Sequence, residues 1–203
     1  MILSQNQLGV FILIYFVVYF SVAFVLKSFI VAKRIGKNPV VLPNDDSAYG
    51  LVGFYFKVTL TLLFVYVLGY AVFPDYQFYL LPIAGLNSVW IMTSGIVLLI
   101  VALVWTVLAQ AHMKDSWRIG IDTETKTRLV TTGLFSVSRN PIFLGMIISL
   151  LGLFLVTPNA LTALFLILGY VLIQIQIRLE EEFLLRQHGP EYKAYKQKVR
   201  RLI

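Results

Sequence analysis

The chain has 203 residues, of which 59% are hydrophobic and 13% are charged, and its formal net charge is +7. The absence of cysteine excludes disulfides, thiolate metal sites and a cysteine nucleophile, and two histidines are too few for a histidine-based metal centre. A soluble domain of this size needs more charge to cover its surface, so the composition predicts an integral membrane protein.

Long apolar runs predict five transmembrane helices, because a run of about 18 or more apolar residues can span the bilayer core. These spans cover Leu8 to Val31, Leu51 to Phe73, Val89 to Ala111, Ile142 to Val156 and Ala160 to Ile177. The first run is too long for a signal-peptide core, so we expect it to be a retained span. The fourth is short, and Thr157-Pro158-Asn159 favours a tight turn into the fifth.

The predicted fold class is an all-α integral membrane protein with five transmembrane helices and a cytoplasmic C-terminal helix. We expect one membrane domain over residues 1–203, with three N-terminal spans in residues 1–111. Residues 112–203 would hold a polar loop, a helical hairpin and a basic tail helix. The stretch from Glu180 to Arg201 predicts that tail helix, lying against the membrane or the loop.

The distribution of basic residues predicts the orientation in the membrane. Lys and Arg follow the first, third and fifth spans, whereas the N-terminal tail, the loop from Pro74 to Ser88 and the turn at Pro158 have none. The positive-inside rule therefore places the N-terminus outside and the C-terminus in the cytoplasm. The net positive charge then indicates a lipid bilayer as the partner, and we expect no nucleic-acid partner.

The polar stretch from Leu129 to Gly145 is the first candidate site. Gly133 permits backbone conformations that other residues avoid. Asn140-Pro141 predicts a helix start, because Asn is a good N-cap and Pro is favoured at the first helical position. A helix N-terminus beside Arg139 suits an anionic group. The same residues also suit a plain helix start at the membrane interface.

The exit of the fifth span is the second candidate site. Gln174, Arg178 and Glu181 have the spacing of residues on one helix face. Glutamates at 180, 181 and 182 are costly at the end of a span unless they are paired or solvated. Such a cluster could meet a cationic cofactor, and it is equally consistent with a solvated helix end that forms local salt bridges.

Two ordered motifs resemble the isoprenylcysteine carboxyl methyltransferase family and its phospholipid methyltransferase relatives. The first runs from Leu129-Val130 through Gly133 to Arg139-Asn140-Pro141 and Gly145. The second has Glu180-Glu181, Leu184, Gly189, Tyr192 and Tyr195 at the family's spacing. The resemblance covers about residues 112 to 201.

This resemblance implies a membrane methyltransferase that uses S-adenosylmethionine on its cytoplasmic side. Arg178 and Glu181 would be catalytic or substrate-positioning residues. The implied cofactor contacts are Leu129, Val130, Gly133, Arg139, Asn140, Phe143, Leu144, Glu180 and Glu181. The family more often has His at position 140 and Tyr at 143. Because Asn does not titrate near neutral pH, proton transfer at position 140 is not expected.

The expected acceptor is a lipid or a lipidated molecule. The scarcity of histidine favours a carboxylate, which needs no base, or an amine that arrives neutral. The resemblance implies a carboxylate of the isoprenylcysteine type. A phospholipid amine, a quinone precursor or a small thiol is an alternative acceptor. Other classes stay open: a nicotinamide enzyme like the sterol reductases, which have a similar segment, or a non-catalytic membrane scaffold.

Overall fold

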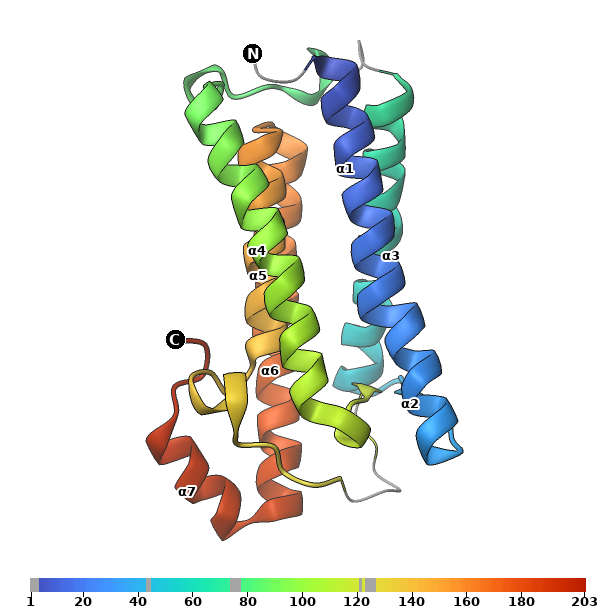
Figure 1. Cartoon of the computed structure of the whole chain (residues 1–203), viewed down its shortest axis with the longest axis vertical. Helices are drawn as coiled ribbons and strands as arrows, with labels where there is room; N and C mark the ends of the chain where they lie inside the picture. Colours follow the sequence, from blue (N-terminus) through green and yellow to red (C-terminus); the bar gives the residue numbers. More distant parts are fainter. Residues whose placement is uncertain (1–3, 43–44, 74–77, 121, 123–126) are drawn as a thin grey trace.

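The computed structural model describes residues 4–42, 45–73, 78–120, 122 and 127–203. Its long helices run side by side along one axis (Figure 1). The first long helix comprises α1 (Gln5–Phe20), the π-helical turn η1 (Ser21–Leu26) and α2 (Lys27–Ile35). The remaining helices are α3 (Ala48–Val72), α4 (Val89–Met113), α5 (Pro141–Val156), α6 (Ala160–His188) and α7 (Pro190–Lys198). Short 3-10 turns are η3 (Ala84–Leu86), η4 (Lys114–Ser116) and η5 (Gly133–Ser136).

The predicted all-α membrane fold is confirmed. Among the described residues, four helices are long and apolar enough to cross a membrane, namely Gln5–Ile35, Ala48–Val72, Val89–Ser116 and Ala160–His188. The fourth predicted span is the shorter apolar helix α5, with 16 residues. The loop predicted between the second and third spans begins at residues 74–77, which lie outside the described residues.

Polar side chains start four of these helices by accepting hydrogen bonds from the first turn. Ser4 and Gln7 form a capping box at α1, and Asn159 forms another with Thr162 at α6. Ser47 and Ser88 cap α3 and α4 in the same way. Each cap satisfies backbone N–H groups that an apolar helix leaves without partners, so it fixes where the span begins.

The C-terminal stretch differs from the prediction of one basic helix from Glu180 to Arg201. Residues up to His188 continue α6, so the glutamates belong to the spanning helix. Gly189 then adopts φ 52°, a conformation that suits glycine, and Pro190 starts α7. The break turns α7 back beneath the bundle, so that the chain ends beside the start of α5 (Figure 1).

The α4–α5 pair is the closest-packed part of the bundle because glycines face it from both helices. A Cβ at Gly95 would lie 2.8 Å from the carbonyl oxygen of Gly152, and one at Gly152 would lie 3.0 Å from that of Gly95. A Cβ at Gly145 would overlap Thr106. Small residues allow helix backbones to approach in a membrane, and here they bring α5 firmly against α4.

Two features of the basic half of the bundle were not predicted. The first helix contains the π-helical turn η1, in which the Ala23 carbonyl accepts a hydrogen bond from Gln110 Nε2 at 2.8 Å. Two-residue strands β1 (Val40–Val41) and β2 (Ile119–Gly120) pair in parallel. They join the segment after α2 to the segment after α4.

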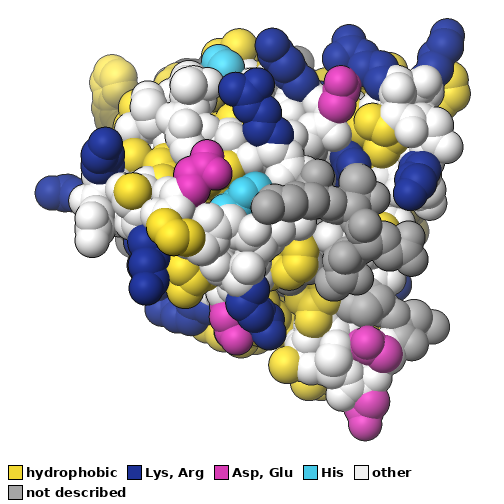
Figure 2. Space-filling view, turned by 90° about the horizontal axis from the view of Figure 1, so that it is seen from below, with side chains coloured by type: hydrophobic (Ala, Val, Ile, Leu, Met, Phe, Trp, Pro, Cys, Tyr) yellow, Lys and Arg dark blue, Asp and Glu magenta, His cyan; other side chains and the backbone are white. Residues whose placement is uncertain are grey.

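Among the described residues, the charged side chains lie toward one end of the bundle. The described residues near the N-terminus of α1 and the C-terminus of α3 carry none. Figure 2 shows the opposite end, where Lys and Arg side chains surround the face and Asp and Glu are fewer. Apolar side chains such as Val65, Val97 and Ile167 are exposed along the bundle between the two ends, as expected of a lipid-facing surface.

Candidate functional site

The loop before α5 is shaped by a glycine with a positive φ angle. Gly133 has φ 63° and begins η5, where its carbonyl accepts a hydrogen bond from Ser136 Oγ at 2.7 Å. A Cβ at this position would overlap the imidazole of His112, at the end of α4. The positive φ angle and the close contact both require glycine at position 133. The contact also places the His112 imidazole directly against the loop.

Asn140-Pro141 begins α5 as predicted, but the Asn140 side chain does not cap the helix. Its Nδ2 atom donates to Glu181 Oε1 at 3.2 Å and to the carbonyl oxygen of Arg201 at 3.0 Å. The backbone N–H of Asn140 donates to the buried Ser138 hydroxyl at 3.1 Å. No side-chain hydrogen bond caps the first turn of α5, which distinguishes it from the four capped helices.

Glu181 is the shared acceptor of a polar cluster between α6, the loop and the C-terminal tail. Its Oε1 accepts from Arg139 Nη2 at 2.8 Å and Nε at 3.1 Å, and its Oε2 accepts from Arg201 Nη2 at 2.9 Å. We call Arg139, Asn140, Glu181 and Arg201 the Glu181 cluster. Two arginines and one carboxylate leave it with one net positive charge.

The ion pair between Arg139 and Glu181 is almost completely buried. Their side chains are 6% and 5% exposed, whereas Arg201 is 34% exposed. Breaking such a buried pair by removing one partner costs about 3–5 kcal/mol, because the remaining charge is left uncompensated. Hydrogen bonds to Glu181 also raise the pKa of the Arg201 guanidinium, so this arginine stays charged at neutral pH.

The C-terminal tail completes this cluster, a role that no sequence pattern indicates. The Arg139 backbone N–H donates to the Arg200 carbonyl at 3.0 Å, and Arg139 Nη1 donates to the Val199 carbonyl at 2.6 Å. In the sequence, Arg201 is recognisable only as part of a basic tail. Only the fold-back at Gly189 brings it to Glu181, so no local pattern could have identified its role.

Two tyrosines of α7 hold the tail against the loop. Tyr195 donates its hydroxyl to the Phe135 carbonyl at 2.6 Å. Tyr192 is 1% exposed, and burial, with a smaller contribution from the Glu181 carboxylate, raises its pKa to about 12. Both hydroxyls therefore act as neutral hydrogen-bonding groups that fix the position of α7.

The remaining predicted site residues are not all brought together. The Glu180 carboxylate accepts a hydrogen bond from Gln176 Nε2 at 2.9 Å. The same Nε2 atom donates to the Tyr49 hydroxyl of α3 at 3.2 Å. Glu180 therefore faces α3 rather than the Glu181 cluster. Arg178 is exposed, and its Nη1 donates to Gln174 on the same helix at 2.9 Å. Leu144 is buried in α5, and half-buried positions are Leu129, Val130 and Phe143.

The comparisons with known proteins identify the family. A family model for phospholipid methyltransferases matches residues 90–191, which is half of the chain and extends from α4 into α7. The chain therefore belongs to the phospholipid methyltransferase family, and the resemblance seen in the sequence is confirmed. It is a membrane methyltransferase of a family that acts on lipid. No curated protein matches the chain.

Proposed function

We propose that the protein transfers a methyl group from S-adenosylmethionine to a lipid acceptor at the charged end of the bundle. The observation that carries this proposal is the Glu181 cluster. It joins the two separate motifs of the chain, Arg139-Asn140 before α5 and Glu181 on α6, through hydrogen bonds of 2.8 to 3.2 Å. The family match contributes the reaction class.

The residues near the cluster have the chemistry that this cofactor needs. S-adenosylmethionine carries a carboxylate, an ammonium group and a sulfonium, and when bound it supplies an electrophilic methyl group. The first turn of α5 has no side-chain cap, so its N–H groups suit the carboxylate. The backbone from Leu129 to Gly133, in the loop before α5, would hold the adenosine part.

Glu181 would act by positioning rather than by contacting the cofactor. Both of its oxygens already accept hydrogen bonds from arginines. It holds Arg139, and through it the start of α5, in one place. Because methyl transfer requires the acceptor in line with the sulfur–carbon bond, such fixed geometry supplies part of the rate.

The acceptor is proposed to reach the site from the bilayer. An apolar cavity of about 90 Å³ lies between α1, α3, α5 and α6. It includes Met146 of α5, six residues or about 9 Å along the helix from Asn140. Its lining is aromatic and aliphatic and includes Phe16, Phe20, Phe56, Leu60 and Leu172. A short part of the acceptor's hydrocarbon chain would fit in this cavity, while the acceptor's headgroup extends toward the loop before α5.

We propose a lipid-borne carboxylate of the isoprenylcysteine type as the first acceptor to test, because it is nucleophilic without a base. The family match favours a phospholipid amine as the second candidate. His112, which packs on Gly133, is the titratable side chain placed to receive a proton from an amine. Arg178, exposed on α6, would meet an anionic headgroup at the membrane surface.

Binding and transfer can be tested with two variants of neighbouring glutamates. Calorimetry should detect S-adenosylhomocysteine on the wild-type protein and on Glu182→Gln, whose side chain is 63% exposed. Binding should be lost or reduced at least tenfold in Glu181→Gln. Binding of a reduced nicotinamide in place of S-adenosylhomocysteine would contradict the proposal.

A further inference from the structure

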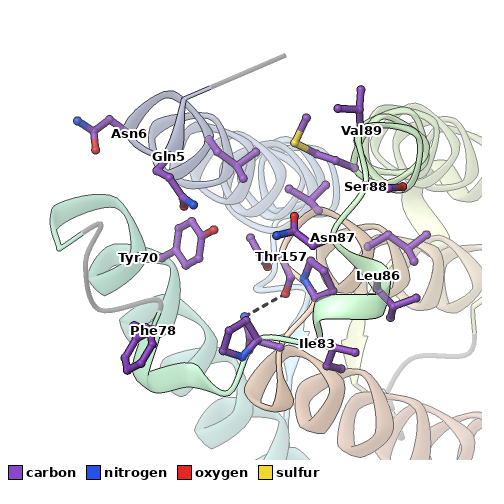
Figure 3. Close-up of a pocket in the computed structure, with 17 residues that line it drawn as sticks. Gln5, Asn6, Tyr70, Phe78, Ile83, Leu86, Asn87, Ser88, Val89 and Thr157 are labelled. Atoms are coloured by element: carbon purple, nitrogen blue, oxygen red, sulfur yellow. Dashed lines mark hydrogen bonds between the residues drawn. The ribbon is translucent and has the colours of Figure 1, made fainter. Parts of the chain in front are cut away.

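A second cavity lies at the end of the bundle where α1 begins and α3 ends, far from the Glu181 cluster. It has a volume of about 880 Å³ and is lined by described residues of α1, α3, α4, the loop before α4 and the α5–α6 turn (Figure 3). Met92 of α4 lines it, and His112 at the other end of α4 contacts the loop before α5. Twenty residues separate them, which is about 30 Å of helix, so this cavity is not part of the proposed methyl-transfer site.

One wall of the cavity is a saturated hydrogen-bond network. The Tyr66 hydroxyl donates to Thr157 Oγ1 and accepts from Asn159 Nδ2, each at 3.0 Å. The loop before α4 is fixed to the same turn, because the Ile83 N–H donates to the Pro158 carbonyl at 2.9 Å. This wall is therefore preorganised, and its buried polar groups have no capacity left over.

Tyr70, unlike Tyr66, is not part of that hydrogen-bond network. It lies one helical turn after Tyr66 and is only 5% exposed, yet its hydroxyl makes no hydrogen bond with any described residue. Figure 3 shows this hydroxyl directed into the cavity. Although the tyrosine ring is buried, its hydroxyl opens onto the cavity, so it can exchange a hydrogen bond with a ligand that enters.

Two amide side chains at the rim add to the polar surface around Tyr70. Gln5 begins α1 and Asn87 precedes α4, and Figure 3 shows both side chains on the cavity. Neither makes a side-chain hydrogen bond within the described part of the chain. The floor is apolar, with Leu8, Met92 and Val156.

The described part of the lining carries no charge. All seventeen described residues that line the cavity are uncharged. A charged ligand would lose hydration without gaining an ionic partner among these residues, whereas hydroxyl groups can exchange hydrogen bonds with a phenol and two amides. The volume lies within the usual range of ligand pockets, about 300–1,000 Å³.

We propose that this cavity binds an uncharged, hydroxyl-bearing ligand of the sugar or glycerol type, with the Tyr70 hydroxyl as its buried anchor. Such a group can arrive as the headgroup of a neutral lipid or as a free solute. The shared chemistry is a set of hydroxyls above an apolar floor. The site is independent of methyl transfer.

The test uses the purified full chain in a polyoxyethylene detergent that contains no sugar. Native mass spectrometry would measure retention of three probes: monoglucosyl dioleoylglycerol, the anionic dioleoylphosphatidylglycerol, and free methyl glucoside. We expect the glucosyl lipid to be retained about tenfold better than the anionic lipid. If methyl glucoside is retained as well, the sugar hydroxyls alone are sufficient for binding. If only the glucosyl lipid is retained, the site binds a lipid.

Tyr70→Phe removes only the anchoring hydroxyl, and its matched control is Tyr55→Phe, an exposed tyrosine of α3 that does not line the cavity. Loss of one hydrogen bond should weaken retention about five- to tenfold in Tyr70→Phe and leave Tyr55→Phe unchanged. Melting temperatures and methyl-transfer rates should match the wild type in both. Retention of neither glucosyl probe, or equal retention by Tyr70→Phe, would overturn the proposal.

Discussion

Glu181 is the residue on which the charged end of the bundle depends. It is 4% exposed and holds two arginines from different segments, so its carboxylate joins α6, the start of α5 and the C-terminal tail. Its neighbour Glu182 is exposed and makes one long ion pair with Arg186 at 3.6 Å. These two adjacent residues therefore have very different energetic roles.

Replacement of Glu181 by Gln should destabilise the protein by about 3–5 kcal/mol, because Arg139 stays buried without its counter-charge. Glu182→Gln should change stability by less than about 1 kcal/mol, since exposed ion pairs contribute little. Thermal unfolding in detergent, with both variants beside the wild type, measures the difference. Equal melting temperatures for the two variants would show that the buried ion pair does not stabilise the fold.

Gly133 is a second residue whose replacement tests the site. Gly133→Ala would place a side chain at a positive-φ position, which costs about 1–2 kcal/mol of stability, and would press it against His112. We expect weaker binding of S-adenosylhomocysteine in calorimetry, and only partial recovery in the double variant with His112→Ala, because the backbone strain remains. Unchanged binding in Gly133→Ala would mean that the loop tolerates another conformation.

At the scale of elements, the packing of α4 against α5 sets the geometry of the site. Gly95 and Gly152 bring the two backbones together, and Trp105 Nε1 donates to the Pro141 carbonyl at 2.8 Å at the start of α5. The first turn of α5 is thus positioned by α4 on one side and by Arg139 on the other.

A pair of matched glycine substitutions tests this packing. Gly95→Ala places a Cβ 2.8 Å from backbone and side-chain atoms of α5 and should cost about 1–3 kcal/mol. Gly69→Ala on α3 meets nothing within 4 Å and should be neutral or stabilising, because alanine favours helix. Melting temperatures of the two variants should therefore move apart, and a larger loss in Gly69→Ala would refute the proposed close packing.

Helix positions and starts were predictable from the sequence because apolar runs and capping residues are local signals. The different directions of the Glu180 and Glu181 side chains also follow from helix geometry, since successive residues on a helix point about 100° apart. The role of Arg201 was not predictable, because it depends on the reversal at Gly189. The Asn140 side chain was assigned to capping, which is its commonest use, but the nearby Glu181 and the tail carbonyl provide alternative acceptors.

At the scale of the whole molecule, the two ends have opposite character. One end has the basic side chains and the Glu181 cluster, and the other has an uncharged cavity. The positive-inside rule therefore supports a cytoplasmic location for the cluster. The cofactor would enter from water at this end, and the lipid acceptor would enter from the bilayer.

The orientation can be measured directly because the chain has no cysteine. Single cysteines at Gly85, where a Cβ meets nothing within 4 Å, and at the exposed Lys198 would report the two ends. In intact cells a membrane-impermeant maleimide should label Gly85→Cys, and it should label Lys198→Cys only after lysis. The reverse pattern would place the Glu181 cluster outside the cell.

The central claim is methyl transfer to lipid, and the most direct test is transfer of a labelled methyl group from S-adenosylmethionine into host membrane extract. The account predicts a labelled lipid product with the wild-type protein and with Glu182→Gln, and a rate at least tenfold lower with Glu181→Gln. Chemical identification of the product would distinguish a methyl ester from a methylated amine. No labelled lipid from the folded wild-type protein, or equal labelling by Glu181→Gln, would contradict the account.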